Sequence, residues 1–219
     1  MRYGVLGTGV VGRTLGTRLV QLGNEVCLGA RAAGGQAALE WVAATGGTAR
    51  EGSFADAAEF GEVLICAVAG AHALSALDMA GAGALRGKVL IDVSNPIAEG
   101  TGFPPSLSVC NTDSVGEQIQ RAFPDARVVK TLNTVNCAVM VDPASVPGPH
   151  SVFVGGEDAA AKKVVVSMLS SFGWPEASVI DLGGIETARG TEMYLALWLR
   201  LMRATGTPSF NVAVHVAGR

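Results

Sequence analysis

The sequence predicts an α/β fold with a doubly wound parallel sheet and a small C-terminal α/β extension that ends in a long helix. Two observations carry this prediction. Short apolar segments alternate with segments in which apolar residues recur at helical spacing along the 219 residues. Several apolar segments are uninterrupted, as expected of parallel strands that helices cover on both faces. Strand and helix alternation of this kind is typical of a parallel sheet.

The first elements of this pattern lie before residue 62. A strand is expected at residues 2–6, and a helix at 10–22, where Leu15 and Leu19 lie on one face. Ser53 and Asp56 are expected to open a later short helix. The elements between them are a strand at 25–28, a helix at 36–45 and a weak strand near Thr48.

The later elements continue the alternation. Residues 63–68 form a continuous apolar run, which predicts a buried strand, and residues 88–93 are expected to form another buried strand. Thr112 is expected to cap the helix that follows the second of these strands. The remaining elements are helices at 71–80, 115–123, 159–172 and 186–203, and strands at 127–132, 151–154 and 178–181. We expect a main domain at 1–145 and, at 146–219, a small extension that caps the site and forms a dimer.

Composition excludes several classes of protein. Hydrophobic residues make up 49% of the chain and charged residues 16%, the opposite of a disordered chain. The net charge is −3 without any run of Lys or Arg, which argues against nucleic-acid binding. The most apolar helix, within 193–202, is shorter than the roughly 20 apolar residues of a membrane span and contains Arg200. The chain is therefore expected to be soluble and cytoplasmic.

A glycine-rich motif joins the first strand to the first helix. It reads G-x-G-x-x-G and comprises Gly7, Thr8, Gly9, Val10, Val11 and Gly12. The three glycines allow a tight turn, a close approach of the backbone to a pyrophosphate, and close packing of helix on strand. The helix N-terminus then favours the negative charge of the phosphates. Because the motif follows a strand and opens a helix, it predicts a Rossmann-type dinucleotide site.

The end of the second strand indicates which dinucleotide is bound. NAD-selective sites usually place Asp or Glu there to hold the ribose 2′-hydroxyl. This strand instead ends at Ala30, and Arg31 follows it. A guanidinium offers a planar set of donors for phosphate oxygens, so NADP(H) is the expected cofactor. The alternative is that Arg31 is a solvated loop charge.

Three further strand ends are expected to face the same crevice, because ligands in open α/β sheets bind beyond the carboxyl ends of the strands. Val68 and Gly70 follow the fourth strand with small neighbours. The residues that follow the fifth and sixth strands are Asn95, Pro96 and Ile97, and Asn133, Thr134, Val135 and Cys137. Asn95, Pro96, Asn133 and Thr134 are expected to position the nicotinamide and its partner, although each polar residue alone could instead cap a loop.

No strong acid–base device is evident in the sequence. His72, His150 and His215 are scattered, and structural hydrogen bonding is the expected role of Asp92. The four cysteines form no CxxC pair, so neither a disulfide framework nor a metal site is expected. Hydride transfer between two organic cofactors needs positioning more than a protein acid or base. The sequence therefore predicts hydride transfer without a catalytic proton donor.

The chain resembles the NADPH-dependent deazaflavin (coenzyme F420) reductases. The resemblance rests on residues 7–12, 29–31 and 128–134, on the segments 152–158 and 162–164, and on the final apolar helix. It implies a Rossmann domain with a small C-terminal part, a homodimer, and NADPH held at Thr8, Gly9, Val10 and Val11, with Ala30 and Arg31 at the 2′-phosphate. It also implies that the loops at Gly70, Pro96–Ile97 and 135–137 contact the nicotinamide and the deazaflavin.

The sequence departs from that family at three places. Ala30 stands where a serine is common, no lysine lies near Gly34 and Gly35, and residues 100–111 form a longer loop beside the expected site. Other functions remain open beside a deazaflavin acceptor. These are a flavin-linked metalloreductase, a reductase of a small imine or 2-keto acid, and a module that senses NADP(H) without turnover.

Overall fold

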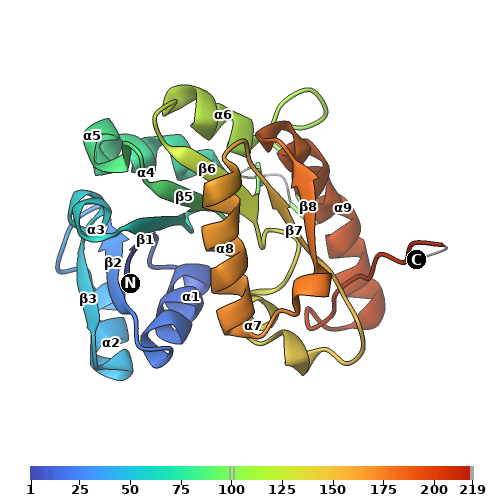
Figure 1. Cartoon of the computed structure of the whole chain (residues 1–219), viewed down its shortest axis with the longest axis horizontal. Helices are drawn as coiled ribbons and strands as arrows, with labels where there is room; N and C mark the ends of the chain where they lie inside the picture. Colours follow the sequence, from blue (N-terminus) through green and yellow to red (C-terminus); the bar gives the residue numbers. More distant parts are fainter. Residues whose placement is uncertain (99, 101, 218–219) are drawn as a thin grey trace.

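One eight-stranded sheet runs through the computed structural model, which describes residues 1–98, 100 and 102–217 (Figure 1). Its order is β3-β2-β1-β4-β5-β6-β7-β8. The strands are β1 (Arg2–Leu6), β2 (Glu25–Ala30), β3 (Ala49–Ser53), β4 (Val63–Cys66), β5 (Val89–Asp92), β6 (Arg127–Thr131), β7 (Val152–Gly155) and β8 (Val179–Gly183). The strand order reverses between β1 and β4, where ligands bind in doubly wound sheets.

The sheet is parallel except at one pair. β7 runs antiparallel to β6, with Thr131 opposite Val154, and β8 is again parallel to β7. A parallel neighbour needs a long crossover, usually a helix across one face. The connection from β6 to β7 instead holds two short elements, α7 (Cys137–Val141) and a 3₁₀ turn (Pro143–Ser145). The predicted α/β class is confirmed, and the C-terminal extension continues the same sheet.

Helices cover both faces of the sheet. One face carries α1 (Val10–Gln21), α2 (Gln36–Thr45), α7 and α8 (Ala159–Phe172). The other face carries α3 (Phe54–Phe60), α4 (Ala73–Ala80), α5 (Ala82–Leu85) and α6 (Val115–Ala122). The long helix α9 (Ala188–Thr205) lies beside α6 at the β8 end of the molecule (Figure 1).

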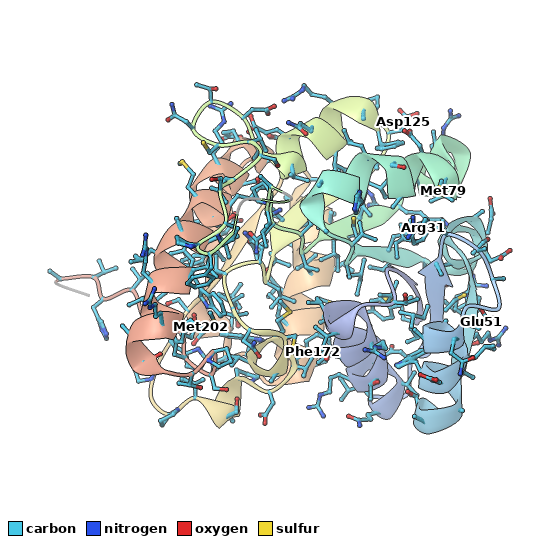
Figure 2. All side chains as sticks on the ribbon, turned by 180° about the vertical axis from the view of Figure 1, so that it is seen from behind. Arg31, Glu51, Met79, Asp125, Phe172 and Met202 are labelled. Atoms are coloured by element: carbon cyan, nitrogen blue, oxygen red, sulfur yellow. The ribbon has the colours of Figure 1, made fainter. Side chains whose placement is uncertain are left out.

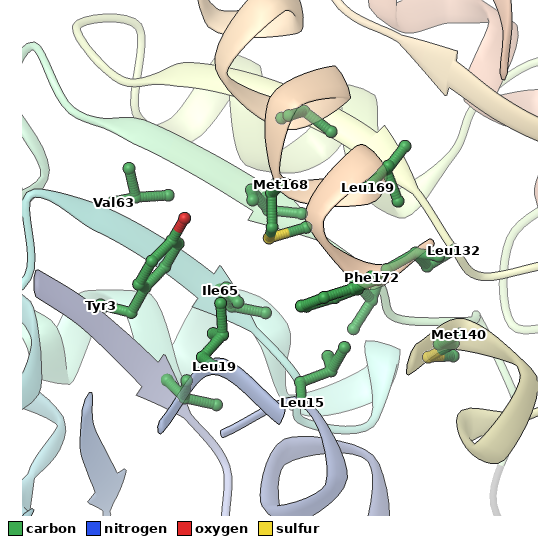
Figure 3. Close-up of a cluster of buried hydrophobic side chains, with 14 of the residues drawn as sticks. Tyr3, Leu15, Leu19, Val63, Ile65, Leu132, Met140, Met168, Leu169 and Phe172 are labelled. Atoms are coloured by element: carbon green, nitrogen blue, oxygen red, sulfur yellow. The ribbon is translucent and has the colours of Figure 1, made fainter. Parts of the chain in front are cut away.

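The core beneath α1 and α8 shows why this face of the sheet is apolar. Figure 3 shows Leu15 and Leu19 of α1 facing Met168 and Phe172 of α8 over the strands. Phe172 is buried in this cluster. The predicted i, i+4 face of α1 is therefore its buried face, as amphipathic helices require.

Two helix starts differ in their agreement with the sequence. At α3 the predicted pair forms a capping box: Ser53 Oγ accepts from the backbone N–H of Asp56, and the Asp56 carboxylate accepts from Ser53 N–H. At α6 the predicted cap Thr112 is wrong. Ser114 Oγ accepts from Glu117 N–H instead, because Ser114 directly precedes the first helical residue, Val115.

The last helix begins and ends later than expected. A 3₁₀ turn (Ile185–Thr187) occupies the expected start, and α9 runs to Thr205, where Gly206 adopts φ +71° and ends it. The following tail returns to the sheet: Ser151 N–H donates to Val212 O, and Phe210 stacks on Trp198 at a centroid distance of 5.4 Å. The tail is thereby fixed to the body of the protein.

Candidate functional site

The turn between β1 and α1 is built so that glycine is required at two of its three glycine positions. Gly7 has φ +123°, and a Cβ there would lie 2.7 Å from Ala67 O. A Cβ on Gly12 would collide with the Gly7 carbonyl. A Cβ on Gly9 would meet nothing within 4 Å. The free space over Gly9 is what a pyrophosphate needs in order to approach the backbone.

The N-terminus of α1 is available to an anion. Gly9 is the residue before the helix and makes no side-chain cap, and the first turn contains no acidic residue. Arg13 N–H makes the first helical hydrogen bond, to Gly9 O at 3.0 Å. The N–H groups that precede it and the helix dipole favour negative charge at this point. The residues present therefore fit the phosphates of a dinucleotide.

A hollow of about 470 Å³ extends from this turn toward α4, and we call it the Arg31 hollow. Figure 2 shows Arg31 beside Met79, on the side of the molecule away from Met202 of α9. The residues that line it are Gly7, Thr8, Gly9, Ala30, Arg31, Ala32, Phe54, Ala67, Val68, Ala69, His72, Ser75, Ala76 and Met79. Its position fits the adenosine half of a dinucleotide.

Arg31 is an exposed cation at the rim of this hollow. Within residues 1–98, 100 and 102–217, no carboxylate forms an ion pair with it. Glu51 on the neighbouring strand β3 instead accepts from Gly34 N–H at 2.9 Å. The guanidinium therefore remains available for an anionic ligand, and it fits a ribose 2′-phosphate.

A second hollow, of about 330 Å³, adjoins the first, and we call it the Asn95 hollow. Ala67, Val68 and Ala69, which follow β4, line both. Its other lining residues are Val10, Val11, Val93, Ser94, Asn95, Ile97, Asn133, Val135, Asn136, Cys137, Met140, Leu195 and Trp198. The two hollows thus form one path across the carboxyl ends of the strands, with room for a nicotinamide at the end near α9.

Asn95 and Asn133 join two strand ends inside this second hollow. Asn95 Nδ2 donates to Asn133 O at 2.8 Å, and Asn133 Nδ2 donates to Asn95 Oδ1 at 3.1 Å. The chain reaches this arrangement through Leu132, which has φ +62° although it is not glycine. A left-handed conformation costs a non-glycine residue about 1–2 kcal/mol. Tertiary packing therefore holds Asn133 in place against a local cost.

The structure brings together most of the residues predicted for the site, but not all. Gly12, Gly70, Pro96 and Thr134 line neither hollow. Gly70 packs against the loop after β5, where a Cβ would collide with Asn95 O, and its N–H donates to that oxygen at 3.2 Å. These residues shape the loops from behind, and direct contact of any of them with a cofactor stays a prediction.

Several lining residues were not predicted. In the Arg31 hollow, His72 directly precedes α4, and Ser75 and Met79 lie on that helix. In the Asn95 hollow, Leu195 and Trp198 lie on α9. The helical spacing of Leu195 and Trp198, three residues apart, marks one face of α9. The sequence could not say which face turns toward the sheet. Met193, also on α9, is exposed and lines neither hollow.

A buried charged cluster lies behind the Asn95 hollow. Lys130 Nζ lies 2.8 Å from Asp92 Oδ2 and 2.8 Å from Glu192 Oε1. Burial alone lowers the pKa of Lys130, but the two carboxylates outweigh it and raise that pKa above its usual value. Burial raises the pKa of Glu192, against the pull of Lys130. The structural role expected for Asp92 is confirmed by these contacts.

None of these three charged groups lines either hollow. Among the lining residues that the structure describes around the Asn95 hollow, Cys137 carries the one titratable side chain. The Asn95 hollow is therefore lined by side-chain amides, one hydroxyl, one thiol and apolar groups. Such a lining suits planar rings and supplies no carboxylate, histidine or lysine.

The loop after β5 folds back over its own start. Ile97 forms an antiparallel bridge with Leu107, and Ser108 N–H donates to Pro96 O at 2.7 Å. This holds the described part of the long loop at residues 100–111 beside the Asn95 hollow. Residue 101 of that predicted loop lies outside the described residues.

In the parts of the chain that the structure describes, no helix combines the length and apolar character of a membrane span. In the same parts, His, Cys, Asp and Glu side chains do not gather in threes where they could hold a metal ion.

Comparison with known proteins identifies the family. The model of the coenzyme F420-dependent NADP oxidoreductases matches residues 2–96. A solved structure from Arthrobacter sp. FB24, described as a candidate F420-dependent NADP reductase, is 47% identical, with a TM-score of 0.93 over 99% of this chain and 100% of that chain.

More distant relatives share parts of this likeness. Metalloreductase STEAP3 of Rattus norvegicus is 30% identical over 209 residues, which are 95% of this chain but 38% of the relative, so the chain spans about two fifths of its length. A reductive aminase of Aspergillus terreus, solved with NADPH, is 17% identical with a TM-score of 0.67, covering 93% of this chain and 63% of that one. At that identity the likeness shows the fold alone.

The match to the Arthrobacter structure spans both chains almost from end to end. The chain therefore belongs to the family of coenzyme F420-dependent NADP oxidoreductases.

Proposed function

We propose that this chain transfers a hydride between NADP(H), bound along the two adjoining hollows, and a deazaflavin such as coenzyme F420, stacked in the Asn95 hollow. The observation that carries the proposal is the continuity of the hollows across Ala67, Val68 and Ala69. A dinucleotide could therefore extend from Arg31, which suits a 2′-phosphate, into the uncharged Asn95 hollow near α9.

The Arg31 hollow supports NADP(H) rather than NAD(H). Its rim has the exposed guanidinium of Arg31, and the tip of β2 ends in Ala30 without a carboxylate. Thr8 and Gly9 bring backbone N–H groups to the position of the pyrophosphate. When bound, NADPH supplies the hydride. The protein binds its phosphates with a helix terminus and an arginine.

The Asn95 hollow supports transfer by positioning. Asn95 and Asn133 hold the ends of β5 and β6 together and present amide groups for a carboxamide. Leu195 and Trp198 of α9 close the opposite side with apolar surface. Two rings confined in this way meet in one orientation, and exclusion of water protects the hydride.

A flavin is the second candidate acceptor. The likeness to the rat metalloreductase covers 95% of this chain at 30% identity, so the same fold serves an enzyme with a different electron acceptor. The described part of the long loop at residues 100–111 lies beside the Asn95 hollow. Its shape would decide whether a deazaflavin or a flavin ring is accepted there. An NADP(H) sensor without turnover would show binding alone.

The C-terminal part supports a homodimer as a further proposal. α9 belongs to the part at 146–219 that the sequence predicts to form a dimer. Leu195 and Leu199 are buried, whereas Met193 is 38% exposed and Leu197 is 54% exposed. Apolar residues left exposed on one face of a helix are suited to a second copy of the chain.

Stopped-flow measurement of NADPH absorbance under anaerobic conditions tests the proposed reaction. Purified protein is mixed with NADPH and F420, with NADPH and flavin mononucleotide, or with NADPH alone. We expect rapid NADPH loss with F420 and much slower loss with the flavin. Faster loss of NADPH with the flavin would favour the metalloreductase-like reaction over the deazaflavin reaction. Binding of NADPH without its loss in any mixture would favour the NADP(H) sensor.

A further inference from the structure

Lys130 is a buried hub whose three ammonium protons all have partners. Its Nζ donates to Asp92 Oδ2 at 2.8 Å and to Ser94 O at 2.7 Å, and it lies 2.8 Å from Glu192 Oε1. Both Lys130 and Glu192 are almost fully buried. A lysine has three N–H donors and no acceptor, so this arrangement leaves none unused. The cluster is therefore rigid and has one preferred geometry.

Glu192 connects this hub to two helices. It belongs to α9, and its carboxylate accepts from Val115 N–H at 2.9 Å and from Gly116 N–H at 3.1 Å, the first N–H groups of α6. A carboxylate at a helix N-terminus satisfies donors that have no partner within the helix. One side chain thus fixes β6, α6 and α9 relative to one another.

The same cluster holds both sides of the Asn95 hollow. On the strand side, Ser94 is held twice, since its N–H donates to Asp92 Oδ1 at 2.9 Å and its carbonyl accepts from Lys130. Asn95 follows directly. On the helix side, Leu195 and Trp198 lie three and six residues after Glu192. The distance across the hollow therefore depends on the contact between Lys130 and Glu192.

We propose that Glu192 is a positioning residue that sets the width of the Asn95 hollow by joining α9 to the strand-end segment Ser94–Asn95 through Lys130. The part that concerns hydride transfer rests on the proposed function. The part that concerns the geometry of the hollow does not.

A neighbouring ion pair provides a matched control. Glu117 of α6 accepts two hydrogen bonds from Arg189 of α9, at 2.6 and 2.9 Å. This pair also joins α6 to α9, but it makes no contact with Lys130 or with residues 94–95. Replacing Glu117 by Gln weakens the same helix pair without touching the link to the strand end.

The replacement Glu192→Gln keeps the shape of the side chain and removes one of its two accepting oxygens. The amide NH₂ cannot accept a hydrogen bond, so the variant loses either the contact with Val115 N–H or the contacts with both Lys130 and Gly116 N–H. Glu192→Asp keeps the negative charge, but its side chain is one methylene shorter, so the carboxylate lies farther from Lys130. This variant is used if Glu192→Gln does not fold.

Amide hydrogen exchange tests the geometric part without any substrate. Peptides covering residues 93–98 and 193–199 are compared in the wild type, Glu192→Gln, Glu192→Asp and Glu117→Gln. We expect faster exchange in both peptides for the Glu192 variants, and an unchanged 93–98 peptide for Glu117→Gln. Unchanged exchange at 93–98 in both Glu192 variants, or an equal increase in Glu117→Gln, would overturn the proposal.

The kinetic part is measured with the acceptor that turns over in the wild type. We expect the Glu192 variants to keep NADPH affinity within about twofold, because the Arg31 hollow is untouched, and to lose roughly 10- to 100-fold in hydride transfer rate, as misplacement by about an ångström does. A larger deuterium isotope effect from 4-deuterated NADPH should accompany the loss. Wild-type rates in the Glu192 variants despite raised exchange would overturn the positioning role, whereas absence of turnover in the wild type would count against the proposed function alone.

Discussion

Asn95 and Asn133 pair across the gap between β5 and β6, each donating from its Nδ2 to the other residue, at 2.8 and 3.1 Å. Neither residue adjoins a carboxylate or a histidine in the Asn95 hollow. The pair can fix geometry but cannot exchange a proton near neutral pH. Its contribution to the proposed reaction is therefore one of orientation.

Removal of one amide should lower turnover without changing its pH dependence. We expect Asn133→Ala to reduce the turnover rate by roughly 100-fold, which is the cost of misplacing reacting groups by about an ångström. The pH profile of kcat should keep its wild-type shape. Asn24→Ala removes an amide that donates to Leu19 O, away from both hollows, and serves as the control. Loss of a titration step near neutral pH in Asn133→Ala would indicate general acid–base catalysis.

Arg31 should decide the choice of dinucleotide. A hydrogen bond to a charged group contributes about 1.5–3 kcal/mol, or roughly 10- to 150-fold in affinity. We expect Arg31→Ala to weaken NADPH by that factor in fluorescence titrations and to leave NADH nearly unchanged. Arg86→Ala, which removes an exposed arginine paired with Asp125, is the control. Equal weakening of both dinucleotides would remove the basis for NADP(H) selectivity.

Substitutions at two glycines of the first turn should affect different properties: one should weaken NADPH binding, and the other should lower the stability of the fold. Gly9→Ala places a methyl group in free space, at φ −70°, where alanine is unstrained. We expect the same melting temperature as the wild type and greatly weakened NADPH binding, because the methyl group occupies the space of the pyrophosphate. Gly12→Ala collides with the Gly7 carbonyl and should lower the melting temperature. Undiminished NADPH binding by Gly9→Ala would place the phosphates elsewhere.

Acid should weaken the start of α6 in a defined pH range. Hydrogen bonds from Arg121 hold the pKa of Asp113 well below its usual value. A carboxyl whose pKa is lower in the folded state stabilises the fold above its unfolded pKa, about 3.9, and this contribution is lost as the pH falls through the folded pKa. Asp113→Asn should therefore be less stable than the wild type in urea at pH 7. The difference should shrink below about pH 4, and a constant difference down to pH 2 would contradict the assignment.

The exposed apolar face of α9 should carry the proposed homodimer. We expect light scattering at micromolar concentration to give a mass near twice the 22.3 kDa of one chain. Leu197→Glu places a charge on the exposed face and should yield monomers with an unchanged melting temperature. Glu40→Ala alters an exposed residue of α2 and should leave the dimer intact. A wild-type mass near 22 kDa would refute the dimer.

Local sequence patterns predicted the parts of the fold that local physics determines. The G-x-G-x-x-G turn, the capping box at Ser53 and the buried strands each depend on neighbours within a few residues. The direction of β7 could not be predicted, because it follows from how short elements fit between β6 and β7. Thr112 was the wrong cap for α6 although the start of the helix at Val115 was predicted, because Ser114 directly precedes Val115 and caps the helix.

The candidate site likewise contains some residues that the sequence predicted and others that depend on how the helices dock. Asn95 and Asn133 were predicted because polar residues at the carboxyl ends of parallel strands gather at one edge. Leu195, Trp198 and His72 were not, because their contribution depends on how α9 and α4 dock. The link between Lys130 and Glu192 joins residues 62 positions apart, and no local pattern announces it.

The two hollows are encoded at different points along the chain. Every residue that lines the Arg31 hollow lies between Gly7 and Met79. The Asn95 hollow needs Trp198, which is held by Phe210 of the tail. During synthesis, the ribosome therefore releases every residue that lines the Arg31 hollow long before the Asn95 hollow has its last wall. Fusions or truncations at the C-terminus should affect the Asn95 hollow first and leave the Arg31 hollow unchanged.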